Sequence, residues 1–321
     1  MAQIRANGIQ LEYDVAGPED GPPLLMVMGF GSQMTSWPVA FRDALAAAGL
    51  RVVRFDNRDV GLSQRFAGTP AARDVAKAVA EGRTPDVPYV LSDMAADAAG
   101  LLEALGIESA HIAGASMGGM IAQLVALNHP AKARSLVSIF STTGDPSLPR
   151  STPEAQAALV SQPATSERAD VVAHAVKNRR VYASTRWAYD EAAAAELAGA
   201  SYDRAFYPEG AVRQYAAILA TPPRTEALRR LALPALVMHG TADTLIPWQA
   251  GAHTAAQIKG SEFVLLDGWG HDFPAPAVPV LADYIAAFVR RAEAERAEGL
   301  ARPAAPGCCA ARSGPARGPG G

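Results

Sequence analysis

Residues 114–119, which read Gly-Ala-Ser-Met-Gly-Gly, carry the clearest chemical signal in the sequence. An apolar run of strand length, 110–115, leads into Ser116, and a stretch with helical spacing follows it. A serine on such a strand-to-helix turn requires small residues two positions before and two positions after it, because a Cβ there would collide with the backbone. Glycine occupies both positions. The pattern predicts a nucleophilic serine whose hydroxyl stands above the carboxyl end of a strand.

A serine hydroxyl also needs a base to accept its proton and a carboxylate to orient that base. Of the six histidines, we expect His271 to be the base, because it lies in a Gly-rich loop directly after the last apolar run, 262–266. Asp243 follows the apolar run 235–239, at the carboxyl end of a strand, where catalytic groups collect in parallel sheets. The sequence therefore predicts Asp243 as the acid, with Asp145, after the preceding strand, as the alternative.

The tetrahedral intermediate of acyl transfer needs two N–H donors that point at its oxyanion. One expected donor is the backbone N–H of Met117, the residue after the nucleophile. The other should come from the loop after the apolar run 24–28, which continues Gly29-Phe30-Gly31. Its glycines allow the backbone to approach a substrate closely, so we expect Phe30 to supply the second N–H.

Apolar runs of strand length alternate with helical stretches over most of the chain, which predicts an α/β fold with a mostly parallel sheet and helices on both faces. The expected strands are 24–28, 51–55, 110–115, 134–140, 235–239 and 262–266. The expected helices are 36–48, 91–105, 117–128, 248–257 and 278–298. An Asn7-Gly8 dipeptide predicts an additional hairpin over residues 3–15.

The stretch 144–226 breaks this rhythm, because it is helical, rich in alanine and rich in aromatic residues. We interpret it as a helical cap inserted into a core formed by residues 1–143 and 227–300. The tail, 301–321, contains mainly Pro, Gly, Ala and Arg without periodicity, which predicts disorder.

Aromatic residues of the cap and of the loops around the predicted site indicate an apolar substrate pocket. The expected pocket residues are Gly29, Met34, Trp187, Trp248 and Trp269.

The composition excludes several classes of function. With 49% hydrophobic residues, a net charge of −3 and no apolar stretch long enough to span a bilayer, the chain is expected to be cytoplasmic and to bind neither nucleic acid nor membranes. The two cysteines, Cys308 and Cys309, are adjacent in the tail and do not indicate a disulfide framework. No metal-ligand spacing and no phosphate-binding glycine loop is present in the sequence, so neither a metal nor another cofactor is expected.

Together these segments resemble carboxylesterases of the α/β-hydrolase fold, and within that fold the bacterial esterases that include the aclacinomycin methylesterases. The resemblance spans about residues 3–295 and rests on four segments, which are 28–31, 55–63, 114–119, and Asp243 with 270–271. It implies the triad Ser116, Asp243 and His271, with Phe30 and Met117 as oxyanion donors. It also implies that Arg58 has a structural role and ties loops together through charge-assisted hydrogen bonds.

The leading hypothesis is therefore hydrolysis of a small to medium carboxylic ester through an acyl-enzyme, with a small-molecule ester as the substrate. Hydrolysis of lactones or carbon–carbon bonds, and cofactor-free perhydrolysis, use the same triad, so the motifs do not separate these activities. A third hypothesis, from a different class, is a receptor that binds a small molecule without turnover.

Overall fold

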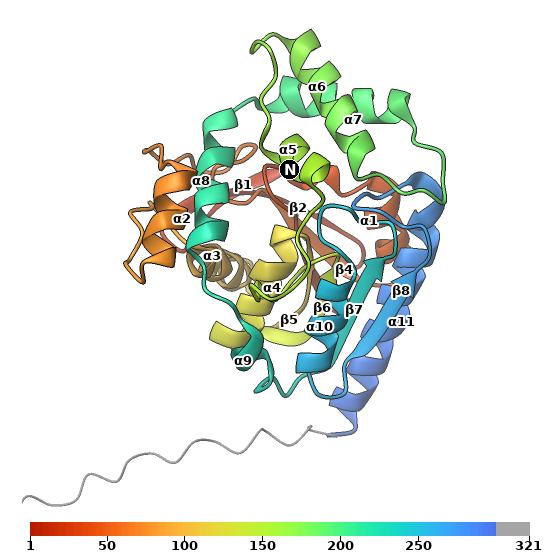
Figure 1. Cartoon of the computed structure of the whole chain (residues 1–321). Helices are drawn as coiled ribbons and strands as arrows, with labels where there is room; N and C mark the ends of the chain where they lie inside the picture. The colour runs from red at the N-terminus through yellow and green to blue at the C-terminus, as the bar shows by residue number, and fades with distance from the viewer. Residues whose placement is uncertain (300–321) are drawn as a thin grey trace, which may run out of the picture.

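Eight strands form one sheet in the computed structural model, which describes residues 1–299 (Figure 1). The strands are β1 (Ala2–Ala6), β2 (Ile9–Ala16), β3 (Pro23–Val27), β4 (Arg51–Phe55), β5 (Ala110–Ala115), β6 (Ala133–Ile139), β7 (Ala235–Gly240) and β8 (Glu262–Leu266). Their order is β1-β2-β4-β3-β5-β6-β7-β8, with β5 near the middle. β1 and β2 run antiparallel to their neighbours, and all other pairs are parallel. The predicted fold class is confirmed.

The antiparallel edge of the sheet begins with the predicted hairpin. Asn7 and Gly8 both have positive φ angles, 49° and 78°, as the tight turn of a two-residue hairpin requires. This turn sets the register of β1 and β2, in which Ala6 pairs with Ile9.

Helices cover both faces of the sheet and bury alternate strand residues. Leu25 and Val27 of β3 pack into the core cluster beneath α3 (Leu91–Ala104) and α4 (Met117–Asn128). Leu24 and Met26 point to the opposite face, where α1 (Val39–Ala47) and α11 (Val278–Ala297) pack. Because both faces of these strands are buried, the strands read as continuous apolar runs in the sequence.

Between β6 and β7 the chain forms a series of helices, and Figure 1 shows α6 and α7 at one end of the molecule, beyond the sheet. The helices are α5 (Pro153–Val160), α6 (Arg168–Val181), α7 (Glu191–Arg204), α8 (Pro208–Ala220) and α9 (Thr225–Leu228). The division into a core and a cap at residues 143 and 227 stays a prediction. The predicted tail, 301–321, lies outside the described residues.

Two helical segments differ from the sequence prediction. The helix expected over 36–48 is a 3-10 turn at Met34–Ser36 followed by α1 at Val39–Ala47, because Pro38 lacks an N–H and separates the two. A further helix that was not predicted, α2 (Ala72–Ala80), packs beside α8. The remaining helix, α10 (Gln249–Gln257), lies against β7. No helix within residues 1–299 is both long and apolar enough to cross a bilayer.

Candidate active site

Ser116 lies on a strained turn between β5 and α4. Its φ and ψ angles are 57° and −123°, a conformation that residues with side chains rarely adopt. A Cβ at Gly114 would lie 2.0 Å from the backbone oxygen of Gly118, and a Cβ at Gly118 would lie 2.1 Å from that of Val27. Both glycines are thus required for strand and helix to approach this closely. The Ser116 N–H donates to the oxygen of Ile139 at 3.0 Å, which ties the turn to the neighbouring strand β6.

Asp243 and His271 are brought together from two loops that follow β7 and β8. The distance from His271 Nδ1 to Asp243 Oδ2 is 2.7 Å, and since a carboxylate only accepts hydrogen bonds, Nδ1 carries the proton. The other carboxylate oxygen of Asp243 accepts from the backbone N–H groups of Leu245 and Ile246 at 2.9 and 2.8 Å. These contacts leave His271 Nε2 without a proton and able to accept one.

A second histidine, His239, also touches the acid. Its Nε2 lies 2.8 Å from the oxygen of Ile246 and 3.3 Å from Asp243 Oδ2. Burial alone would raise the pKa of Asp243, but His271 and His239 outweigh it and lower the pKa to about 2. No role was expected for His239 from the sequence; its spacing of four residues before Asp243, across the glycine turn, is the signal that would have indicated one.

The loop that contains His271 is held by backbone contacts with the segment after α6. The His271 N–H donates to the oxygen of Tyr182 at 2.7 Å. Ser184 accepts from the N–H of Gly270 at 3.0 Å and donates through Oγ to Asp272 at 2.5 Å. Burial raises the pKa of Asp272, and the hydrogen bonds from Ser184 oppose that rise. Segments almost 90 residues apart in sequence therefore fix the position of the base.

On the other side, the ring of His271 packs against Phe140, with the ring centroids 4.4 Å apart. Phe140 directly follows β6, whose Ile139 accepts the Ser116 N–H, so His271 and Ser116 approach the same strand end. No hydrogen bond between the Ser116 hydroxyl and His271 is present among the described residues. Such contacts are often long without substrate and shorten in the reacting complex.

The loop after β3, residues 28–34, which we call the β3 loop, lies directly against the serine. A Cβ built on Gly29 would be 3.1 Å from Ser116 Cβ and 3.6 Å from its Oγ. Within the described residues, the N–H groups of Phe30 and Met117 have no hydrogen-bond partner. Two free donors therefore flank Ser116, at the chain positions predicted for the oxyanion hole.

The expected pocket residues fall into two groups. Trp187 and Trp248 are half-buried, and Trp187 packs against the core cluster that contains Phe140. Met34 and Trp269 are fully buried, and the Trp269 Nε1–H donates to the oxygen of Asp272 at 2.8 Å. Met34 and Trp269 thus expose no surface to solvent, and a role in lining the pocket stays a prediction for both. Trp269 belongs to the core cluster that contains Phe140.

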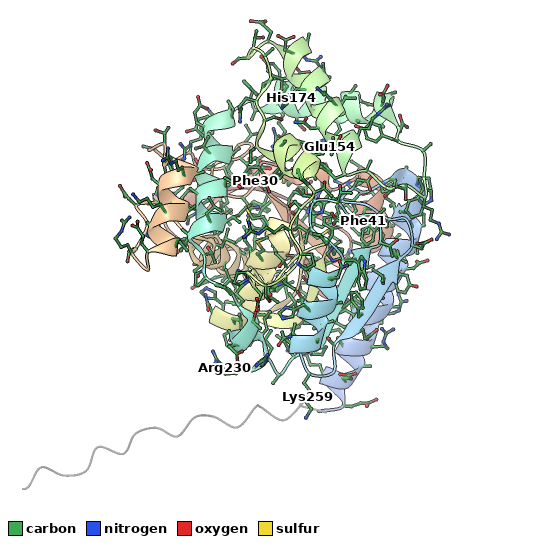
Figure 2. The ribbon with its side chains drawn as sticks, viewed as in Figure 1. Phe30, Phe41, Glu154, His174, Arg230 and Lys259 are labelled. Atoms are coloured by element: carbon green, nitrogen blue, oxygen red, sulfur yellow. The ribbon has the colours of Figure 1, made fainter. Side chains whose placement is uncertain are left out.

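Two other aromatic residues, Tyr182 and Phe30, lie beside His271 and in the β3 loop. Tyr182 lies edge-on to the ring of His271, with a centroid distance of 6.1 Å. Phe30 contacts Tyr215 of α8 at 5.9 Å. Figure 2 shows Phe30 close to the sheet, whereas His174 lies far out on α6, away from the site. The sequence suggested aromatic enrichment here, but it did not indicate which rings face the histidine.

The alternative acid, Asp145, has different partners. Its carboxylate accepts from Ser147 and from the Thr225 hydroxyl at 3.0 Å, and it makes no contact with His271 among the described residues. The hydrogen bonds from Ser147 are the main cause of its lowered pKa.

The segment after β4 has the structural role predicted for it. Arg58 donates through Nε and Nη2 to Asp97 of α3 at 2.6 and 2.7 Å. The guanidinium also lies over the rings of Phe66 and Tyr89. Burial raises the pKa of Asp97, although the contact with Arg58 opposes that rise. No group of three His, Cys, Asp or Glu side chains within residues 1–299 is arranged to hold a metal ion.

Hydrolases of the α/β type present their nucleophilic serine on a strained turn between a strand and a helix, and Ser116 lies on such a turn. The comparison with protein families agrees with this class, since the family described as alpha/beta hydrolase fold matches residues 22–275, and the chain belongs to that family.

Relatives within the family have several activities. The chain is 28% identical over 312 residues to rhodomycin D methylesterase DauP of Streptomyces sp. strain C5, covering 90% of this chain and 98% of the relative. It is 28% identical over 310 residues to 2-hydroxymuconate semialdehyde hydrolase of Pseudomonas sp. strain CF600, covering 91% and 94%. The solved structure of a meta-cleavage product hydrolase from Pseudomonas fluorescens IP01 superimposes with a TM-score of 0.72 at 19% identity, covering 91% of this chain and 98% of that one. The predicted hydrolase class is thus confirmed.

Proposed function

We propose that this enzyme hydrolyses small to medium carboxylic esters through a covalent acyl intermediate on Ser116. The observation that carries the proposal is the 2.7 Å contact between Asp243 and His271, on loops that reach the strand end where Ser116 stands. Similarity to a rhodomycin D methylesterase over 90% of the chain supports an ester as substrate.

In the proposed mechanism, Ser116 Oγ attacks the ester carbonyl while His271 Nε2 accepts its proton. The carbonyl oxygen becomes an oxyanion, which accepts hydrogen bonds from the N–H groups of Phe30 and Met117. His271 then returns the proton to the departing alcohol as the carbon–oxygen bond breaks. A water molecule, deprotonated by His271, attacks the acyl-enzyme, releases the carboxylic acid and restores Ser116. Asp243 remains ionised throughout, since its pKa is about 2.

A second candidate is hydrolysis of a carbon–carbon bond, which the similarity to 2-hydroxymuconate semialdehyde hydrolase supports. The same triad would serve for this reaction. The half-buried Trp187 and Trp248 are proposed to contribute to the substrate pocket in either case. A cap at 144–226, a cytoplasmic location and the lack of a nucleic-acid or membrane partner remain predictions.

The test is covalent labelling by a fluorophosphonate, located by mass spectrometry, together with turnover of p-nitrophenyl acetate and butyrate. We expect a label on Ser116 in the wild type, no label in Ser116→Ala, and turnover only in the wild type. Labelling without ester turnover would favour the carbon–carbon substrate. If the wild type is not labelled at all, the serine is not activated and the proposal is wrong.

A further inference from the structure

We propose that Gln214, on helix α8, is a positioning residue that fixes the β3 loop and thereby orients the Phe30 N–H toward the oxyanion. Gln33, at the other end of the loop, assists it. The inference rests on the proposed function, because it assigns a role in forming the oxyanion hole. It adds that helices distant in sequence, and not the loop itself, determine the geometry of that hole.

Gln214 makes two hydrogen bonds that fix its side chain in one orientation. Its Oε1 accepts from the N–H of Gly31 at 2.8 Å, and its Nε2 donates to the oxygen of Arg58 at 2.8 Å. The side chain is fully buried. Rotation of the amide by 180° would place donor against donor and acceptor against acceptor, so only the observed orientation satisfies both partners.

Helix α8 is itself a firm support for this side chain. Arg213, beside Gln214, donates to both carboxylate oxygens of Asp59 at 2.8 and 2.9 Å, and both side chains are buried. A Cβ at Gly210 would lie only 1.9 Å from the backbone oxygen of Asp59, so the helix backbone packs directly on the segment after β4. A bidentate buried pair together with direct backbone contact restricts movement of α8 relative to the sheet.

The other end of the β3 loop is attached to α7. Gln33 Nε2 donates to the oxygens of Ser201 and Ala205 at 2.7 and 2.9 Å. Arg204 donates to Gln33 Oε1 at 2.7 Å and pairs with Asp56 at the same distance.

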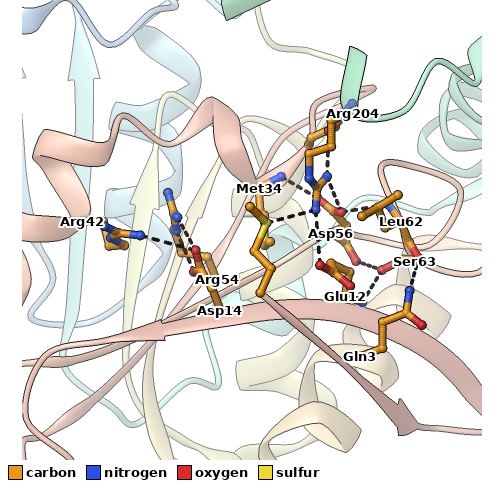
Figure 3. A network of polar contacts seen from close by, with 12 residues as sticks. Gln3, Glu12, Asp14, Met34, Arg42, Arg54, Asp56, Leu62, Ser63 and Arg204 are labelled. Atoms are coloured by element: carbon orange, nitrogen blue, oxygen red, sulfur yellow. Dashed lines mark hydrogen bonds and ion pairs between the residues drawn. The ribbon is translucent and has the colours of Figure 1, made fainter. Parts of the chain in front are cut away.

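Asp56 also accepts a hydrogen bond of 2.8 Å from the backbone N–H of Met34, the last residue of the loop. Figure 3 shows this contact beside Arg204. The loop is therefore attached at Met28, whose oxygen accepts from Asn57 Nδ2 at 2.9 Å, at Gly31 and at residues 33–34.

These attachments determine the direction of the Phe30 N–H. Gly29 packs against Ser116 on one side of Phe30, and Gly31 is held by Gln214 on the other. Among the described residues 28–32, one hydrogen bond joins two backbone groups of the loop. It runs from the Ser32 N–H to the oxygen of Gly29 and is long, at 3.3 Å. Without Gln214 the peptide groups on either side of Phe30 can rotate. A misdirected donor weakens binding of the oxyanion, which exists only in the transition state and intermediate, and leaves substrate binding almost unchanged.

The test compares two substitutions of a buried glutamine by methionine, which keeps the length of the side chain and removes both hydrogen bonds. Gln214→Met removes the proposed contact. Gln123→Met on α4 is the matched control, because Gln123 is also fully buried, accepts from Arg224 at 2.9 Å and donates to Ser138 at 3.4 Å, outside the β3 loop.

For each protein, kcat and KM are measured with p-nitrophenyl butyrate. The Kd is measured for phenylboronic acid, which forms a tetrahedral adduct with an active serine.

For Gln214→Met we expect kcat and the affinity for the boronic acid to fall together by about tenfold to a hundredfold, with KM within about twofold of the wild type. For Gln123→Met we expect kcat and the affinity for the boronic acid to stay within about threefold of the wild type, even if the Tm of this variant falls as far as that of Gln214→Met. The inference is wrong if Gln214→Met keeps its kcat, if it changes KM alone, or if the control loses as much kcat.

If Gln214→Met does not fold, Gln33→Met provides the same measurement from the other end of the loop, with the same expected and contrary results. Fluorophosphonate labelling of the wild type separates the two levels of the argument. An unlabelled wild type would refute the proposed function and this inference with it. A labelled wild type with an unaffected boronic acid Kd in the loop variants would refute this inference alone.

Discussion

Replacing Asp243 by asparagine tests the assignment of the acid, because the two side chains have the same shape and differ in one donor group. In the native protein one carboxylate oxygen accepts from the N–H groups of Leu245 and Ile246, and the other accepts from His271. The asparagine oxygen will remain with the two N–H groups, since its amide nitrogen would oppose them. The amide NH₂ must then point at His271.

This arrangement reverses the tautomer of the histidine. An NH₂ donor opposite Nδ1 requires that Nδ1 be unprotonated, so the proton moves to Nε2, which can no longer accept the proton of Ser116. The same NH₂ group also opposes the N–H of His239, 3.3 Å away. Loss of the correct tautomer in a serine triad costs about 10⁴-fold in kcat, equivalent to about 5 kcal/mol in the barrier.

The assay is kcat for p-nitrophenyl acetate, with the rate of fluorophosphonate labelling of Ser116 as a second measurement that does not depend on deacylation. Asp145→Asn is the matched control, and we expect it to stay within about twofold of the wild type, because Asp145 contacts Ser147 and Thr225 instead of His271. A kcat for Asp243→Asn within about tenfold of the wild type would refute the reasoning. A large loss in Asp145→Asn instead would transfer the role of acid to that residue.

Three further predictions follow from contacts elsewhere in the site and its supports. The pKa of Asp243 falls from its ordinary 3.8 to about 2 on folding, so its ionised form contributes about 2 kcal/mol of stability above pH 4, and this contribution is lost as the pH falls through 2. In urea unfolding, the difference in stability between wild type and Asp243→Asn should therefore be about 2 kcal/mol smaller at pH 2 than at pH 5. A difference that does not change with pH would contradict the shift. Gly114→Ala places a Cβ 2.0 Å from a backbone oxygen, so it should abolish kcat and lower the Tm by several degrees, and an active, stable variant would show that the turn has room. Arg58→Met leaves the carboxylate of Asp97 buried without its cation, so the free energy of unfolding in urea should fall by about 3 kcal/mol. The folded fraction, measured by active-site titration, should keep its kcat. A loss of stability below about 1 kcal/mol would mean that the pair contributes little.

The sheet could be predicted from sequence because its signals are local. β4, β5 and β8 begin and end at the expected residues; β4 and β5 are buried almost throughout and appear as largely apolar runs, whereas β8 is a half-exposed edge strand that its apolar residues still mark. The helices were predicted less well, because their boundaries depend on single residues that the apolar periodicity does not reveal. Pro38 divides the segment expected as one helix, and α2 went unpredicted although its apolar residues Val75, Ala78 and Val79 repeat with helical spacing.

The predicted site residues also divide by the range of their signals. Ser116 is marked by the glycines around it, and His271 and Asp243 by their places after strands, which a parallel sheet brings to one edge. His239 lies only four residues before Asp243, but the contacts of Tyr182 and Gln214 join segments whose separation no local pattern encodes. For Gln214 and Gly31 the separation is 183 residues. The side chains that hold the site in place therefore required the three-dimensional structure.

The segment from Tyr182 to Arg186, which holds the loop of His271, follows α6, whose main packing partners are the helices α5 and α7 and not the sheet. All residues of α6 are described, and none of them is buried. Local opening of such a region costs much less free energy than unfolding the sheet, because it exposes few apolar contacts. Each opening would release the N–H of His271 from Tyr182 and interrupt catalysis while the sheet stays intact. Activity should therefore disappear at lower denaturant concentration than the far-UV circular dichroism signal, and amide hydrogen exchange in α6 should be fast compared with β5.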